Sequence, residues 1–234
     1  IEAFNHPVLS RNLRGEALIN YKRSLGLTLE QKSILIGTLL GDASIRNSKA
    51  NYCVKFEQKE QRTEYIIHLA KVFESFTGTG PKKRVIRNVF HRDYGVSCWF
   101  RTYSHIVFKY YADLFYSIKN KKREKRVPKN IHKYLDARAL AYWFMDDGSY
   151  YFSPLDLMLN TQGFKLGDQK ILIQALKRNF NLNATLVKDK HFLRLLFNRS
   201  SSAKMAQLIE SYMHFDFHYK LETILEAKKQ GRLI

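Results

Sequence analysis

An internal duplication limits the folds open to this chain more than any other feature of its sequence. The segment LIGTLLGDAS at 35–44 aligns without gaps with LAYWFMDDGS at 140–149, an offset of 105 residues that pairs Asp42 with Asp147. In each copy an apolar run ends in aspartate and a small residue. An ordinary surface helix separates its charges from its core residues. Two such copies predict two related halves, each with a carboxylate at the end of a buried helix.

The elements expected after each copy follow the same order. A strand-like run comes first, then a segment with apolar residues at helical spacing, then two strand-like runs and a last helical segment. These runs are 51–58, 64–76, 84–90, 94–100 and 104–118 in the first half, and 156–162, 168–180, 184–189, 191–197 and 202–213 in the second. The sequence predicts an α+β fold of two α-β-β-α-β-β-α repeats, over 28–132 and 133–234, after an N-terminal extension over 1–27.

Two glycines in the first copy indicate how the halves could meet. Gly37 and Gly41 are spaced i, i+4, which permits close approach of a second helix. The second copy departs from this pattern, with Tyr142 and Asp146 at the aligned positions. We therefore expect the two motif helices to lie side by side in an asymmetric pair.

The aspartates at the helix ends require a cation. A carboxylate there faces the negative end of the helix dipole, which is unfavourable unless a metal ion or a lysine compensates. Lys125 and Lys220 each follow the last helical segment of a half, 83 and 73 residues after the aligned aspartates. A glutamine also ends the first strand-like run of each half, with Asp-to-Gln spacings of 16 and 15.

The match between those glutamines, Gln58 and Gln162, is incomplete. Gln58 shares strand parity with apolar Val54 and Phe56, whereas Gln162 shares it with Asn160. A bulge in one strand would reconcile the two positions. Without a bulge, one of the glutamines is an ordinary strand-end residue.

The charge balance predicts a polyanionic partner. The chain has 40 Lys and Arg against 21 Asp and Glu, a net charge of +19 with an isoelectric point near 9.9. The basic residues are spread through apolar-patterned segments, which indicates a folded basic surface. The run KNKKREKR at 119–126 is the densest cluster and is typical of a solvated face.

Composition also argues against several other classes of protein. No stretch approaches the roughly 18 to 20 apolar residues of a membrane span, and no signal-peptide pattern opens the chain, so a soluble intracellular protein is expected. Cys53 and Cys98 are expected to be buried thiols, too few for a disulfide framework or a four-ligand zinc site. His214 and His218 have i, i+4 spacing without a zinc motif, and we expect them to pack or contact phosphate.

The motifs LIGTLLGDA and LAYWFMDDG, with the shared downstream order, resemble those of the LAGLIDADG homing endonucleases. The resemblance is to the single-chain, two-repeat forms and covers roughly residues 28–228. It implies a monomeric, site-specific endonuclease that makes double-strand breaks in DNA by Mg²⁺-dependent phosphodiester hydrolysis, with Mn²⁺ or Ca²⁺ able to substitute for binding.

The resemblance also implies roles for single residues. Asp42 and Asp147 would bind metal between the two scissile phosphates. Gly41, Ala43 and Asp146 would lie beside them in the metal site. Gln58 and Gln162 would order water, and Lys125 and Lys220 would support a solvent network or the developing charge.

Four strand pairs, two in each half, predict a pair of twisted antiparallel sheets whose polar faces line a saddle for duplex DNA. A two-stranded ribbon fits the major groove, where basic and amide side chains read base edges. The candidate DNA contacts are Lys55, Glu57, Lys83, Arg84, Arg87, Arg92 and Arg101 in the first half, and Asn160, Lys188, Lys190, Arg194 and Arg199 in the second.

Two other functions remain open at this point. An RNA maturase on the same fold would bind intron RNA with a similar basic surface. A DNA-binding regulator without cleavage activity would use the sheets to bind DNA and would not cut it. Resemblance favours an intron-encoded or free-standing form over an intein, and expression in a mitochondrion or chloroplast. The first 27 residues are either an arm over DNA or an added extension.

Overall fold

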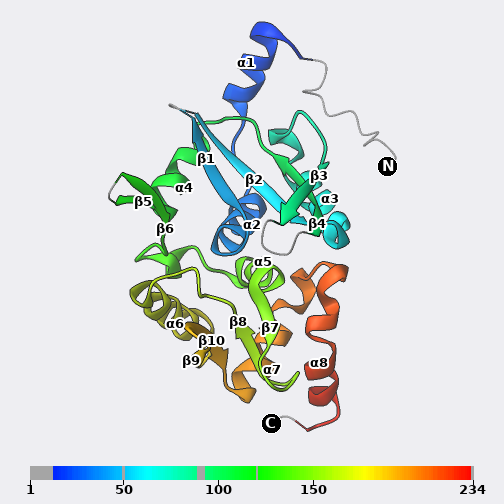
Figure 1. Cartoon of the computed structure of the whole chain (residues 1–234), viewed down its shortest axis with the longest axis vertical. Helices are drawn as coiled ribbons and strands as arrows, with labels where there is room; N and C mark the ends of the chain where they lie inside the picture. Colours follow the sequence, from blue (N-terminus) through cyan, green and yellow to red (C-terminus); the bar gives the residue numbers. More distant parts are fainter. Residues whose placement is uncertain (1–12, 49–50, 89–92, 120, 233–234) are drawn as a thin grey trace. The chain divides into compact units, whose positions relative to one another are not determined.

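The computed structural model describes residues 13–48, 51–88, 93–119 and 121–232 (Figure 1). The chain divides into two compact units, which we call unit 1 and unit 2. Unit 1 comprises residues 1–31 and 42–112, and unit 2 comprises residues 32–41 and 113–234. Among the described residues, no helix is both long enough and apolar enough to cross a membrane.

Unit 1 contains a four-stranded antiparallel sheet with helices on one face. Its strands are β1 (Ser44–Ser48), β2 (Asn51–Lys59), β3 (Lys82–Asn88) and β4 (Asp93–Arg101), in the order β1-β2-β4-β3. Its helices are α1 (Gly15–Ser24), α3 (Thr63–Val72) and most of α4 (Val107–Phe115), with 3-10 turns at Glu60–Arg62 and Glu74–Phe76. The rings of Phe56 and Phe100 stack in its core with centroids 4.8 Å apart.

Unit 2 contains a second four-stranded antiparallel sheet and a separate hairpin. The sheet strands are β7 (Gly148–Tyr150), β8 (Leu157–Leu159), β9 (Ala184–Asp189) and β10 (Phe192–Phe197), in the order β7-β8-β10-β9. The hairpin is β5 (Tyr116–Lys119) with β6 (Lys122–Lys125). The helices are most of α2 (Leu29–Leu40), α5 (Ala137–Asp147), α6 (Leu166–Phe180), α7 (Arg199–Ile209) and α8 (Glu222–Lys229), with 3-10 turns at Ile131–Lys133, Glu210–Tyr212 and Phe215–Lys220.

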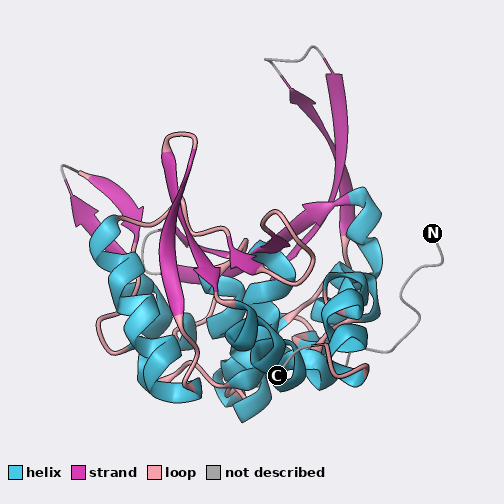
Figure 2. Cartoon of the chain, turned by 90° about the horizontal axis from the view of Figure 1, so that it is seen from below, coloured by secondary structure: helices cyan, strands magenta, loops and turns pink. Residues whose placement is uncertain are grey.

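The element order confirms the predicted duplication. Both α2-β1-β2-α3-β3-β4-α4 and α5-β7-β8-α6-β9-β10-α7 follow the order α-β-β-α-β-β-α, and the two sheets share one strand order. In Figure 2, the strands of each unit lie to one side of that unit's helices. Each unit therefore presents one face of its sheet away from its helix layer.

Two predicted elements end earlier than expected. The helix predicted over 104–118 stops at Phe115, because the next residues form β5, in which Tyr116 and Ile118 alternate with polar residues. The strand predicted over 156–162 covers only Leu157–Leu159. The compact units also cut across the repeats, since most of α2 belongs to unit 2, so the repeat boundaries stay a prediction.

Local capping explains where the two motif helices begin. Thr28 and Gln31 form a capping box at the start of α2. The backbone amide of Gln31 donates to Thr28 Oγ1 at 3.1 Å, and the backbone amide of Thr28 donates to Gln31 Oε1 at 3.0 Å. At the start of α5, the Asp136 carboxylate accepts from the backbone amide of Ala139 at 2.7 Å and from the Ser33 hydroxyl at 2.5 Å. These bonds satisfy backbone donors that would otherwise be unpaired.

The N-terminal extension is partly described. Residues 1–12 lie outside the described part of the chain, while α1 belongs to unit 1 and contacts the rest of that unit. The Tyr21 hydroxyl donates to the carbonyl of Ser75 at 3.0 Å, and His105 Nε2 lies 2.8 Å from the carbonyl oxygen of Lys22. These contacts fix α1 on unit 1, and whether it contacts DNA stays a prediction.

Candidate functional site

The two motif helices pack closely within unit 2. A Cβ placed on Gly37 would lie 2.2 Å from the carbonyl oxygen of Ala139 and 2.9 Å from Tyr142 Cβ. A Cβ on Gly41 would lie 2.5 Å from Asp146 Cβ. Each glycine of the first copy thus faces the larger residue that replaces it in the second copy. The predicted asymmetric pair is confirmed, and Asp146 packs against Gly41.

Asp42 lies just beyond α2, in a turn that leads into β1. Its side chain is exposed, and Gln58 Nε2 donates a hydrogen bond to Asp42 Oδ2 at 2.7 Å. Gln58 lies near the end of β2, opposite Cys98 of β4. A side-chain hydrogen bond therefore joins Gln58 to Asp42, the glutamine and the aspartate predicted in the first repeat. The neighbouring Ala43 is buried.

Asp147 is the last residue of α5 and is half-buried. Its backbone carbonyl accepts two hydrogen bonds from Asn160, one from the backbone amide at 2.9 Å and one from the side-chain Nδ2 at 2.8 Å. Asn160 Nδ2 also lies 3.2 Å from the hydroxyl of Ser149. Asn160, predicted as a DNA contact, thus holds the backbone of Asp147 in place through these hydrogen bonds.

The predicted equivalence of Gln58 and Gln162 is wrong. Ser44 pairs with Lys55, and the aligned Ser149 pairs with Met158, so strand register matches Gln58 with Thr161. Gln162 lies one residue further on, in an exposed turn after β8. The aligned pair Ser44 and Lys55 is separated by 11 residues, whereas Ser149 and Met158 are separated by 9, so the shorter second hairpin brings Thr161 to the position that Gln58 holds in the first.

Lys220 and Lys125 neutralise the ends of the two motif helices. Lys220 is buried, and its Nζ donates to the carbonyls of Gly148, Met145 and Phe144 at 2.7, 2.8 and 3.4 Å. Lys125 Nζ donates to the carbonyl of Gly41 at 2.7 Å. Helix C-termini favour a cation at their unpaired carbonyls. Each lysine therefore lies at the end of a motif helix, while the catalytic role predicted for Lys125 and Lys220 stays a prediction.

No zinc-like cluster accompanies these residues. Within the described ranges, no group of three or more His, Cys, Asp and Glu is placed to hold a metal ion. His218 Nε2 lies 3.1 Å from the carbonyl oxygen of Met213, and His214 Nδ1 accepts from the amide of Asp216 at 3.3 Å. Both histidines make local hydrogen bonds, and whether either contacts phosphate stays a prediction.

The face of the unit 1 sheet opposite its buried core carries a charged network, which we call the Glu57 network. Glu57 Oε1 accepts from Arg84 Nε at 2.5 Å and from the Ser97 hydroxyl at 2.7 Å, while Glu57 Oε2 pairs with Lys55. Lys55 is 8% exposed and its Nζ lies 5.5 Å from the centroid of the Trp99 ring. Partial burial raises the pKa of Glu57, but hydrogen bonds from Lys55, Ser97 and Arg84 outweigh it and hold that pKa below its ordinary value.

The register of the unit 1 strands places the predicted DNA contacts of this unit on two different faces of the sheet. Directly paired residues share a face, so Arg101 joins Lys55, while Lys83 lies on the face opposite Arg84 and pairs with Glu60 at 2.6 Å. The prediction of one shared face is wrong for Lys83. Arg87 lies in β3, its side chain is outside the described part of the structure, and Arg92 lies wholly outside the described residues.

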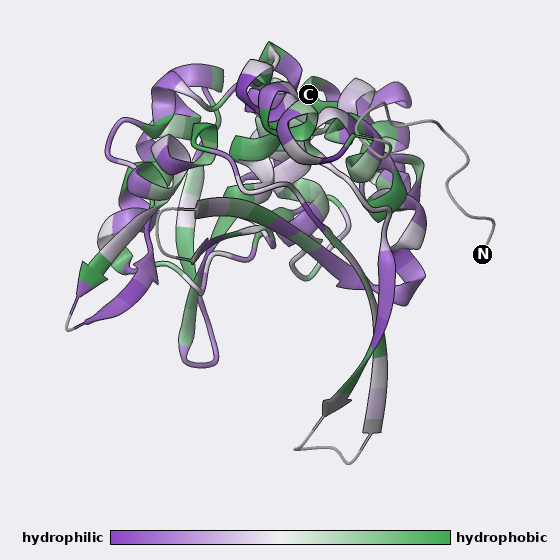
Figure 3. Cartoon of the chain, turned by 90° about the horizontal axis from the view of Figure 1, so that it is seen from above, coloured by the Kyte–Doolittle hydropathy of each residue, from purple (hydrophilic) through white to green (hydrophobic). Residues whose placement is uncertain are grey.

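The corresponding face of unit 2 is much less charged. Met158, Val187 and Leu196 lie on it, and Phe192 near the hairpin tip is 51% exposed. Its arginine, Arg194, is paired with Asp189 at 2.7 Å. Figure 3 shows apolar colouring along parts of the unit 2 strands.

Three other predicted contacts of unit 2 lie off this face. Lys188 pairs with Leu193 and so shares the parity of the buried Leu195, although it is exposed near the tip. Lys190 lies in the β9–β10 turn with φ of 56°. Arg199, predicted beside the strands, is the first residue of α7 and lies 3.6 Å from Asp156. Strand parity and the helix start at Arg199 explain these differences.

Comparison with known proteins decides the family. The sequence profile described as the LAGLIDADG DNA endonuclease family matches residues 32–205. The chain belongs to the LAGLIDADG DNA endonuclease family. It is 31% identical to the probable intron-encoded endonuclease 1 of Wickerhamomyces canadensis, over 82% of this chain and 83% of that protein. It is also 27% identical to the cytochrome b mRNA maturase bI2 of Debaryomyces hansenii, over 87% of this chain and 77% of that protein.

A solved structure supports the same assignment. The homing endonuclease I-WcaI bound to its DNA recognition sequence has a TM-score of 0.82 and 27% identity, covering 92% of this chain and 97% of that one. The resemblance and the fold class predicted from the two motifs are therefore confirmed. For this LAGLIDADG chain, sequence analysis missed Ser97 and Trp99, whose only sequence signal was their alternation with buried Cys98 and Phe100 in β4.

Proposed function

We propose that this LAGLIDADG chain is a site-specific endonuclease that makes double-strand breaks in duplex DNA by Mg²⁺-dependent phosphodiester hydrolysis. The observation that carries the proposal is the repeated arrangement of an aspartate at the end of a motif helix whose carbonyls are neutralised by a lysine, Asp42 with Lys125 and Asp147 with Lys220. Family membership and the intron-encoded relatives support it.

The residues present fit a magnesium ion better than a zinc ion. Mg²⁺ typically binds through one or two carboxylates and keeps several waters or substrate phosphate oxygens. Asp42 is exposed and Asp147 is half-exposed, so both carboxylates are within reach of solvent. We propose that they hold the metal, which would polarise the phosphate and lower the pKa of bound water, with Mn²⁺ or Ca²⁺ able to replace it for binding.

The protein's own side chains would prepare this site. The amide of Gln58 orients the Asp42 carboxylate through its 2.7 Å hydrogen bond. Asn160 fixes the Asp147 backbone by a bond to its carbonyl. Gly41 and Ala43 flank Asp42, and Asp146 packs on Gly41, so we assign these three to supporting the metal site. Gln162, exposed in its turn, is the weakest of the proposed water-ordering residues.

The outer sheet faces would bind the duplex. We propose that the protein acts as a monomer in which each face binds one half of a long site. Lys55, Arg84 and Arg101 share one face of unit 1 and offer donors for guanine edges and phosphates. The DNA complex of I-WcaI supports this use of the fold. The net charge of +19 would add strong, salt-dependent attraction to the phosphates.

An intron RNA maturase is the second candidate function. The observation that favours it is the 27% identity to the cytochrome b mRNA maturase of Debaryomyces hansenii. Both functions suit an intron-encoded protein, and we propose expression in a mitochondrion or chloroplast. A regulator without cleavage activity is less consistent with an aspartate, Asp42 or Asp147, at the end of each motif.

Selection of cleaved duplexes from a random library tests the proposal. We expect recovery of one long site in Mg²⁺ and none when the metal is chelated. Tight binding of a structured group of intron RNAs, with no duplex cut at any metal concentration, would support the maturase instead.

A further inference from the structure

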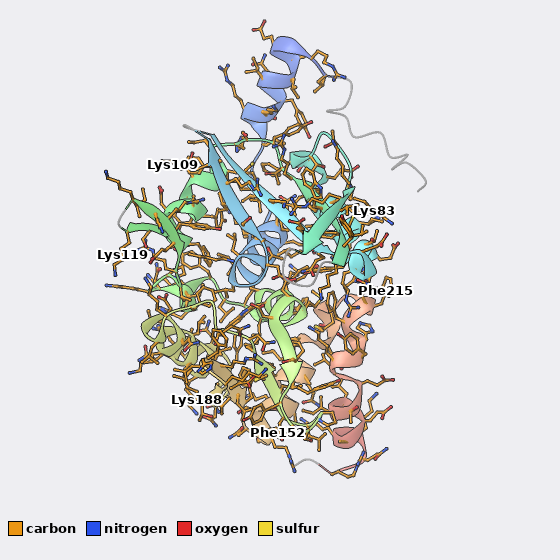
Figure 4. All side chains as sticks on the ribbon, in the orientation of Figure 1. Lys83, Lys109, Lys119, Phe152, Lys188 and Phe215 are labelled. Atoms are coloured by element: carbon orange, nitrogen blue, oxygen red, sulfur yellow. The ribbon has the colours of Figure 1, made fainter. Side chains whose placement is uncertain are left out.

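Among the described residues of the second half, no hairpin corresponds to β5–β6. The β5–β6 hairpin joins the two repeats and forms a two-stranded sheet of its own within unit 2. Lys119 pairs with Lys122, and Lys121 lies in the turn between the two strands. Lys119, Lys121 and Lys122 are exposed, and Lys119 extends outward in Figure 4. We call these three residues the lysine tip.

The lysine tip is unfavourable for the hairpin itself. Like charges directly across an antiparallel pair destabilise it, and Lys119 and Lys122 are such a pair. Lys121 has φ of 60°, a conformation that asparagine or glycine adopts at lower cost. Residues that are unfavourable for local folding are often found at functional sites. The sequence therefore keeps three positive charges at a position where folding alone would favour other residues.

The base of the hairpin is held in place by its own contacts. Lys125 donates to the Gly41 carbonyl at 2.7 Å, and Arg126 Nη2 donates to the Asp113 carbonyl at 3.0 Å. The Arg123 guanidinium lies 3.7 Å from the centroid of the Tyr116 ring. These contacts anchor the two strands, so the tip is presented on a fixed base next to a motif-helix end.

The hairpin extends on the side of unit 2 where a duplex would bind. In Figures 2 and 3, it and the β9–β10 hairpin project from the same side of the unit 2 helices. The outer sheet face of unit 2 is poor in unpaired cations, since Arg194 is paired with Asp189. A nearby cationic element would supply the phosphate contacts that this face lacks.

We propose that the lysine tip binds the sugar–phosphate backbone of duplex DNA, contacting at least two phosphates. This inference rests on the proposed function and adds a contact outside the two four-stranded sheets. Lysine ammonium groups bind phosphate as point charges, and most protein–DNA hydrogen bonds go to the phosphate and sugar groups. The contact would hold the duplex without selecting its sequence.

Charge neutralisation at the tip tests this inference. The variant is Lys119→Gln/Lys122→Gln, and its matched control is Lys170→Gln/Lys204→Gln, two exposed lysines on α6 and α7 of the same unit. Affinity for the selected duplex and for an unrelated duplex is measured across a salt series. Loss of two phosphate contacts should reduce the log–log salt slope by about 2. We expect equal weakening on both duplexes, and no slope change for the control.

A second variant separates binding from folding. Lys121→Asn keeps the turn conformation at lower cost while removing a charge, so it should unfold at the same or a higher temperature and still reduce the slope by about 1. Tip variants with the parental slope would overturn the inference, as would weakened binding to intron RNA with unchanged binding to duplex. Because the parental chain is tested for cleavage separately, failure of the hairpin contact is distinguishable from failure of the endonuclease proposal.

Discussion

The Lys220 ammonium lies 2.7 Å from the Gly148 carbonyl oxygen and donates to two further carbonyls at the end of α5. Replacing Lys220 with methionine leaves these acceptors without their donor and the helix end without its cation. We expect a loss of about 2 kcal/mol in the free energy of unfolding, measured by urea denaturation. Cleavage should slow by about 10²- to 10³-fold in single-turnover assays at a temperature where the variant is folded.

Lys125→Met provides the comparison within the same chain. Lys125 donates to the carbonyl of Gly41 and is less buried than Lys220. Its replacement should therefore cost less stability while still slowing cleavage. Lys204→Met, on the exposed side of α7, should change neither property. Equal stability of the Lys220→Met variant and the parent would contradict the capping role.

The contact of Gly37 with α5 predicts a large effect from one methyl group. In Gly37→Ala the new Cβ would meet the Ala139 carbonyl oxygen at 2.2 Å, and a backbone atom cannot rotate away. The helices must separate, at a cost of about 3 kcal/mol. Gly26→Ala is the control, since no atom lies within 4 Å of its Cβ position. Thermal unfolding of both variants checks the difference, and similar midpoints would refute the close approach.

The Glu57 network predicts that one carboxylate controls base discrimination. Glu57→Gln removes the charge that orients Lys55 and Arg84. We expect cleavage to become more tolerant of base changes in one half of the site, with discrimination reduced by about 1 to 3 kcal/mol at one or two positions. The control is Glu60→Gln, which loses a pair with Lys83 on the other face. An unchanged cleavage profile for Glu57→Gln would rule out this role.

The same carboxylate gives a pH dependence with a defined sign. The pKa of Glu57 is lowered from its ordinary value of 4.5, so its folded form prefers the charged state. Its stabilising contribution is present above the unfolded pKa and is lost as pH falls through the lower folded pKa. The stability difference between the parent and Glu57→Gln should therefore shrink as pH falls below about 4.5. A difference that grows in acid would contradict this sign.

The contrast between the two outer sheet faces predicts unequal reading of the two half-sites. Unit 1 offers charged donors, whereas Val187 and Leu196 of unit 2, which are partly exposed, offer apolar contacts. Apolar side chains recognise the thymine methyl group. Replacing thymine with deoxyuracil should therefore reduce cleavage more in the half-site that Glu57→Gln leaves unaffected. Equal effects in both halves would argue against the apolar reading.

The sequence predicts the repeated architecture well because duplication is a property of order and spacing. The motif helices, both sheets and the Gly37 approach all follow from patterns of apolar and small residues. Positions that depend on register were predicted less well. Gln162 lies one residue from the position that matches Gln58, and Lys83 lies on the face opposite Arg84, because a shift of one residue reverses a strand's faces.

Side-chain partners were beyond the reach of sequence patterns. The spacing of Lys125 and Lys220 indicated paired cations, but not that their ammonium groups bind backbone carbonyls. The charge run at 119–126 was predicted to be a solvated face, and the structure makes part of it a strand pair. Such contacts depend on tertiary placement, which a single sequence does not specify.

The most direct test of the central claim compares binding and cutting by Asp42→Asn and Asp147→Asn. Each change keeps the size of the side chain and removes the charge that a metal requires. With the selected duplex and Mg²⁺ at saturating enzyme, we expect that neither variant makes double-strand breaks while both bind the site nearly as tightly as the parent. Double-strand cleavage at the parental rate by both variants would contradict the assignment of these aspartates to the metal site.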